Sequence, residues 1–96
     1  MSLFVVQHSH AAETCPAGHP EMGPMLVQHV SQENAAKFGV NVHSEAVVDG
    51  THAFYLIVDA QSEEKVRDFM APFYQVGTVE IMPASSCERV VERGKC

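Results

Sequence analysis

The sequence predicts one α+β domain, built on a four-stranded antiparallel sheet with two helices on one of its faces. The chain has 96 residues, which is the length of a single domain spanning residues 1–96. Apolar residues make up 46% of it and charged residues 19%, so the chain can bury a core. Segments with strand and helix patterns follow one another in the order β-α-β-β-α-β.

The first half of the chain starts with a strand pattern and then a helix pattern. Residues 3–8 form a β-branched and aromatic run, which is typical of a strand. Proline and glycine interrupt residues 11–23, which predicts a loop. A helix is expected over residues 24–38, with Pro24 in its first turn and Gly39 ending it.

A hairpin is predicted next. Residues 40–48 alternate as in a half-buried strand, with Val40, Val42, Ala46 and Val48 on one face. His43 falls on the polar face, where Glu45 is its expected partner. Asp49-Gly50 is a strong turn signal, and residues 52–59 are apolar on both faces, as in a central strand.

The second helix begins after Ser62, a good helix cap. It carries apolar residues at helical spacing, namely Val66, Phe69, Met70 and Phe73, and Pro72 should distort its last turn. A fourth strand is expected over residues 77–83. Ser85 and Glu88 then form a possible capping box for a terminal helical turn through Val91.

This order is that of the split β-α-β, or ferredoxin-like, fold. Two helices cover only one face of such a sheet, which leaves an apolar set on the other, namely Val47, Tyr55, Ile57 and Met82. An apolar patch of this kind favours association in a small protein. We therefore expect a homodimer in which two sheets pack face to face, a dimeric α/β barrel.

The element order, the Asp-Gly hairpin and the closing segment Gly-Thr-Val-Glu-Ile-Met-Pro of residues 77–83 resemble small bacterial dimeric α/β-barrel proteins. The resemblance covers residues 3–83. It implies membership in an uncharacterised family of a group that also includes monooxygenases, isomerases and stress-response proteins. It carries over no catalytic residue.

Charge and cysteine usage exclude several classes of function. The formal net charge of −6 argues against a nucleic-acid partner or an anionic membrane surface. No apolar run reaches the roughly 20 residues of a membrane helix. Cys15, Cys87 and Cys96 are odd in number and lack paired spacing, so no disulfide framework is expected. We expect a cytoplasmic protein.

Six histidines in 96 residues are the most informative feature of the composition. His8 and His10 point to the same side of an extended strand, with Cα atoms about 6–7 Å apart. Cys15 follows in a loop, and His52 opens the strand that should lie beside the first. These four residues are the predicted ligands of a transition metal ion, because imidazole and thiolate suit zinc, copper or iron.

Two other functions are open from the sequence alone. The domain could be a metal-free enzyme, monooxygenase- or isomerase-like, that binds a small organic molecule in a barrel pocket. In that case a histidine would be the natural general base. It could also be a non-catalytic binding module.

Overall fold

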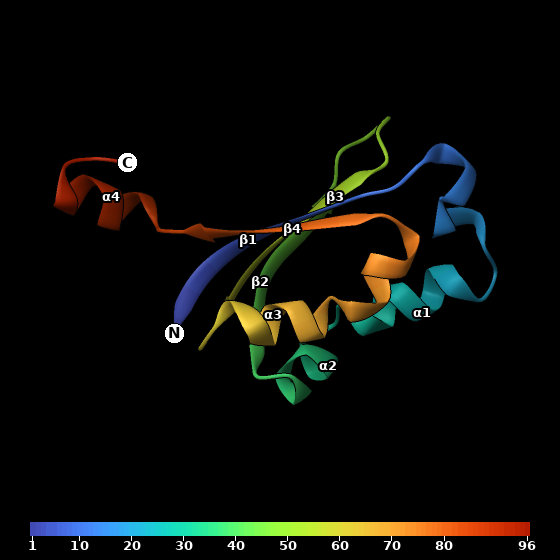
Figure 1. The fold of residues 1–96 in the computed structure, drawn as a ribbon, viewed down its shortest axis with the longest axis horizontal. Helices are drawn as coiled ribbons and strands as arrows, with labels where there is room; N and C mark the ends of the chain where they lie inside the picture. The colour runs from blue at the N-terminus through green and yellow to red at the C-terminus, as the bar shows by residue number, and fades with distance from the viewer.

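The computed structural model describes all residues from Met1 to Cys96 and contains one four-stranded antiparallel sheet. The strands lie in the order β2-β3-β1-β4, so β3 and β1 are central (Figure 1). Their bounds are Ser2–Ser9 for β1, Val40–Val47 for β2, Ala53–Ala60 for β3 and Thr78–Ala84 for β4. All four predicted strands are present, each within one residue of the expected bounds.

The single helix predicted over residues 24–38 is wrong, because two short helices replace it. These are α1 (Met22–His29) and α2 (Gln32–Lys37). The side chain of Ser31 accepts a hydrogen bond from the backbone N–H of Asn34 and so starts a new helix. The Asn34 amide in turn donates to the carbonyl of His29, the last residue of α1. Capping at Ser31 therefore interrupts a pattern whose apolar spacing looked continuous.

The core lies between the helices and one face of the sheet. Helix α3 (Glu63–Phe69) begins after Ser62, whose side chain accepts from the N–H of Lys65. Pro72 lies in a 3₁₀ segment, η3 (Ala71–Val76), that follows the helix. The four apolar residues predicted for this region are all buried, in a cluster with alternate residues of β1 and β3. These residues are Phe4, Val6, Leu56, Val58, Val66, Phe69, Met70 and Phe73.

A bulge in β2 corrects the predicted faces of that strand. The pairing with β3 shifts between Val42 and Ser44, so that Glu45 and Val47 lie opposite Leu56 and Phe54. Leu56 is fully buried beneath the helices. Directly paired residues of antiparallel strands lie on the same face. Val47 is therefore on the helix-covered face, not on the open face, and Ala46 is on the open face.

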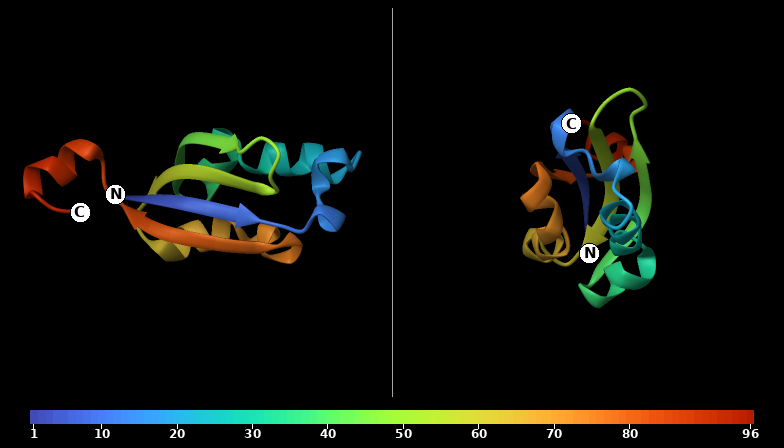
Figure 2. Two further views of the ribbon diagram at one scale, coloured as in Figure 1. Left: turned by 90° about the horizontal axis from the view of Figure 1, so that it is seen from above. Right: turned by 90° about the vertical axis from the view of Figure 1, so that its right-hand side faces the viewer.

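The chain ends in a helix, α4 (Cys87–Arg93), that projects beyond the sheet next to the N-terminus (Figures 1 and 2). Its cap is Ser86, whose side chain accepts from the N–H of Arg89, and not Ser85 as the capping-box pattern suggested. No residue of α4 is buried. The helix is thus an extension of the body and not part of its core. None of the helices has the length and apolarity needed to traverse a bilayer.

Candidate metal centre and adjoining cavity

The β1–β3 register brings two of the predicted ligands face to face. The last pair of the ladder is Ser9 opposite Ala53. One step further, the backbone N–H of His10 donates to the carbonyl of His52 at 3.0 Å. The two side chains therefore lie on the same face, with ring centroids 5.1 Å apart. This neighbourhood follows from the antiparallel pairing expected from the sequence.

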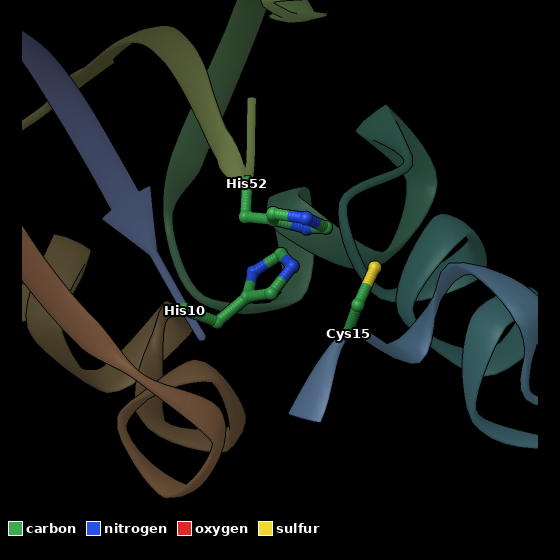
Figure 3. Close-up of side chains that lie close together, drawn as sticks. All are labelled: His10, Cys15 and His52. Atoms are coloured by element: carbon green, nitrogen blue, oxygen red, sulfur yellow. The ribbon is translucent and has the colours of Figure 1, made fainter. Parts of the chain in front are cut away.

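Cys15 completes a group of three. It lies between two single 3₁₀ turns, η1 (Ala12–Thr14) and η2 (Pro16–Gly18), in an extended conformation. This loop folds back so that its thiol faces the two rings, and all three side chains point toward one another (Figure 3). One potential ligand atom from each of His10, Cys15 and His52 lies within 4.8 Å of the others. We call these three residues the His/Cys cluster.

The fourth predicted ligand, His8, lies one layer deeper and outside the His/Cys cluster. It is 1% exposed, and its Nε2 lies 3.1 Å from the carbonyl oxygen of Phe73. Its ring packs on Phe54 and Phe73, at centroid distances of 5.2 Å each, and on His10 at 5.4 Å. Burial lowers the pKa of His8, although the bond to the Phe73 carbonyl opposes the shift. The His8 ring therefore packs against the His10 ring on the side of the core.

His10 has no hydrogen-bond partner at either ring nitrogen, and both nitrogens are shielded from solvent. Buried polar atoms nearly always have a partner, because leaving one unsatisfied costs about 1–3 kcal/mol. Burial lowers the pKa of His10, and the neighbouring His52 lowers it further. A neutral imidazole with free lone-pair capacity is the form of histidine that binds a metal.

A cavity of about 510 Å³ adjoins the His/Cys cluster, between α1 and the covered face of the sheet. Its polar lining residues include His8, His10, Cys15, Glu45, Thr51 and His52. Its apolar walls include Leu26, Val27, Val30, Val47, Phe54 and Phe73. This volume lies in the range of small-molecule sites.

The other histidines have partners elsewhere. His19 caps α1, since its Nδ1 accepts from the backbone N–H groups of Glu21 and Met22. His29 connects α1 to α3, with its Nε2 2.6 Å from the carbonyl oxygen of Phe69. His43 pairs with Asp59 at 2.8 Å, and not with Glu45, because the bulge turns Glu45 to the opposite face.

Cys87 and Cys96 lie at the far end of the molecule from the His/Cys cluster. Cys87 begins α4, which follows the end of β4 that pairs with the start of β1. The His/Cys cluster lies beyond the other end of β1. All three cysteines are free.

Sequence reasoning missed the walls of the cavity. Glu45 and Val47 reach it only because of the bulge. Phe73 reaches it from a 3₁₀ segment, whereas its helical spacing predicted only that it would be buried. One signal was available, since three consecutive polar residues, His43 to Glu45, break the alternation of the strand. The contribution of Phe73 to the cavity had no comparable signal.

The His/Cys cluster provides two nitrogens and one sulfur. Three protein ligands leave one coordination position for water or a substrate, which is the pattern of catalytic zinc sites. The set also suits copper or iron, since imidazole and thiolate bind both. Comparison with protein families gives one match, over residues 4–95, to a family described as a domain of unknown function (DUF3303). A comparison with curated proteins finds no match.

Proposed function

Because the chain belongs to the DUF3303 family, whose description assigns no function, we propose its function from the site: the protein binds a transition metal ion through His10, Cys15 and His52. The observation that carries this proposal is the His10 ring. Both of its nitrogens are shielded and unpartnered, and it lies between a thiol and a second imidazole. A metal ion would satisfy one nitrogen of His10 and hold all three side chains.

The distances fit a site that closes slightly on binding. A tetrahedral ion with bonds of roughly 2.0–2.3 Å requires ligand atoms roughly 3.3–3.8 Å apart. The three ligand atoms lie within 4.8 Å of one another. Cys15 is on a loop between short turns, so a shift of about 1 Å requires no change in the sheet. The ion would be zinc, copper or iron, since a thiolate disfavours calcium and magnesium.

The fourth position of the ion would face the cavity, because all three residues line it. An open position next to a largely apolar cavity is the arrangement of a metal enzyme, in which the ion polarises a bound substrate or water. His8 would act through His10, by fixing the orientation of its ring. The acidic cavity residue Glu45 is the available general acid or base.

The functional unit is a homodimer with the ferredoxin-like, dimeric α/β-barrel arrangement. The strand order β2-β3-β1-β4 supports this, as does the open face of the sheet. On that face Val5 lies between Ile57 and Met82, which are 40% and 37% exposed. A second copy would cover this stripe and give α4 a packing partner. The free cysteines suit a cytoplasmic location.

The test is metal binding by protein purified without a histidine tag. After treatment with chelator, the wild type is titrated with Co²⁺, which reports thiolate coordination by a charge-transfer absorption. We expect one ion per chain. His10→Ala and Cys15→Ser should weaken binding at least about 100-fold, while His43→Ala, outside the cavity, should match the wild type.

Binding that is substoichiometric, or that is unchanged in both cluster variants, would refute the metal site. If Co²⁺ binds, its displacement by Zn²⁺ at equilibrium measures the affinity of the site for Zn²⁺. Circular dichroism of each variant checks that the fold is retained.

A second candidate is the metal-free enzyme acting on a small organic molecule, and the cavity favours it. In this case His52 or Glu45 would transfer protons to a substrate held between α1 and the sheet. The two candidates differ in one measurement. A turnover that persists in the chelated protein, and in Cys15→Ser, supports the metal-free enzyme, whereas turnover restored only by added metal supports the metal site.

A further inference from the structure

His8 is the most deeply buried polar side chain in the molecule, and one side of its ring is unsatisfied. It is 1% exposed, it lines the cavity, and its Nδ1 has no hydrogen-bond partner. The opposite nitrogen, Nε2, lies 3.1 Å from the carbonyl oxygen of Phe73. No carboxylate is bonded to the ring to hold a second proton there.

The Phe73 carbonyl fixes the state of this ring. A carbonyl oxygen only accepts hydrogen bonds, so Nε2 must carry the hydrogen that it receives. A neutral imidazole has one hydrogen, so Nδ1 is a lone-pair acceptor. His8 lines the cavity, and its Nδ1 is therefore a shielded acceptor without a donor on a residue of the cavity wall. An acceptor of this kind selects for a ligand with O–H or N–H.

The rest of the cavity defines the body of that ligand. Leu26, Val30 and Phe54 form apolar walls, and Phe73 places its ring edge-on to Phe54 at 5.2 Å. The volume of about 510 Å³ admits a molecule of one or two rings. Walls of this kind give affinity to an apolar body, while the few polar groups fix its orientation.

We propose that the cavity binds a small, mainly apolar alcohol, phenol or heteroaromatic N–H compound, whose single donor group bonds to Nδ1 of His8. The inference deepens the proposed function, because this molecule would lie beside the His/Cys cluster as its substrate or ligand. It does not require the metal ion, since His8 is not one of the three ligands.

The probes are 1-naphthol and 1-methylnaphthalene. They share a ring system and nearly the same shape, but only 1-naphthol has an O–H donor. Binding is measured by calorimetry or ligand-observed NMR with chelated protein and again after metal loading. We expect 1-naphthol to bind about tenfold more tightly than 1-methylnaphthalene in the chelated protein, which is the effect of one buried hydrogen bond.

Three variants locate the effect. His8→Gln retains an N–H donor for the Phe73 carbonyl but lacks the Nδ1 acceptor, so the preference for 1-naphthol should disappear. His43→Ala, which lies outside the cavity, should leave the preference intact. Val27→Trp adds bulk at an exposed position on the cavity wall and should weaken both probes. Thermal melts of all three check folding.

Equal affinity for the two probes in the wild type would overturn the inference, as would a preference that survives in His8→Gln. Binding unaffected by Val27→Trp would also overturn it, because the probes would then bind elsewhere. These failures are distinct from failure of the metal site, which is read from Co²⁺ binding in the absence of any probe. A preference seen only after metal loading would mean that the ion, and not His8, selects the hydroxyl.

Discussion

Two adjacent imidazoles lie at the end of β1, the buried His8 and the half-buried His10, and both have shielded nitrogens without a hydrogen-bond partner. A charged ring at either position would lack the hydration that it has in water, and neither ring has an acidic partner. Burial is the largest cause of the lowered pKa of both rings. At the residue scale, the environment that leaves His10 suited to metal binding also makes both rings sensitive to acid.

The stability of the metal-free protein should therefore fall as the pH falls below 6.5, the ordinary pKa of histidine. In this range the unfolded chain binds more protons than the folded chain, because the folded pKa values are lower. The free energy of unfolding should decrease by up to about 1.4 kcal/mol per pH unit for each ring, and it should level off below the folded pKa values. Urea denaturation between pH 7.5 and 5.5 in the presence of chelator measures this.

The matched variant carries His8→Gln and His10→Gln together. Its unfolding free energy should vary less with pH over the same interval, whatever its absolute stability. If its pH profile runs parallel to that of the wild type, the two rings are not the acid-sensitive groups.

At the scale of the element, α3 fixes the covered side of the sheet. Its apolar residues keep helical spacing, and Phe69 is fully buried. The ring of Phe69 stacks on His29 at 5.2 Å with an angle of 14° between the planes, and it contacts Phe38 at 5.7 Å. A carbonyl at the end of α3 also bonds to His29 of α1. Phe69 thus joins three helical segments.

Phe69→Ala should lower the free energy of unfolding by about 3–5 kcal/mol, because it removes a fully buried aromatic ring and leaves a cavity. Thermal or urea denaturation measures the loss. Asp68→Ala, on the exposed side of the same helix, is the control and should change stability by less than about 0.5 kcal/mol. A melting temperature of Phe69→Ala equal to that of the wild type would show that α3 does not pack as described.

At the scale of the whole molecule, the two faces of the sheet differ. Helices α1 to α3 cover one face, while the other carries an apolar stripe formed by Val5, Ile57 and Met82. Helix α4 extends past the sheet and buries none of its own residues. Isolated helices of this length are unstable in water, which favours a partner that covers both features.

We predict that Ile57→Glu converts a dimer into a monomer, because it places a charge at the centre of two facing sheets. Sedimentation velocity at micromolar concentration measures the change. Met25→Glu is the control, since Met25 is 58% exposed on α1, on the helical side of the molecule, and should leave the dimer intact. A wild-type protein that sediments as a monomer at this concentration would contradict the proposed dimer.

Local pattern alone determined the four strands, the position of α3 and its buried residues, because apolar periodicity and caps act over a few neighbouring residues. The predicted topology, in which the end of β1 lies beside the start of β3, also places His10 near His52 from the sequence alone. The sequence also predicted Cys15 as a ligand, but it did not determine where the thiol lies, because a loop of that length can reach several positions. These inferences depend on backbone pairing rules that hold in any sheet.

Only the tertiary structure decided the break between α1 and α2, the bulge in β2, and the layer to which His8 belongs. Ser31 caps a new helix, and the Asn34 side chain donates to the His29 carbonyl across the break. The apolar spacing does not reveal these polar contacts, so it predicts one continuous helix. The bulge brings Glu45 to the cavity by shifting the register by one residue. His8 lies outside the His/Cys cluster, with its Nε2 bonded to the carbonyl of Phe73, 65 positions away. This contact depends on how the helices pack on the finished sheet.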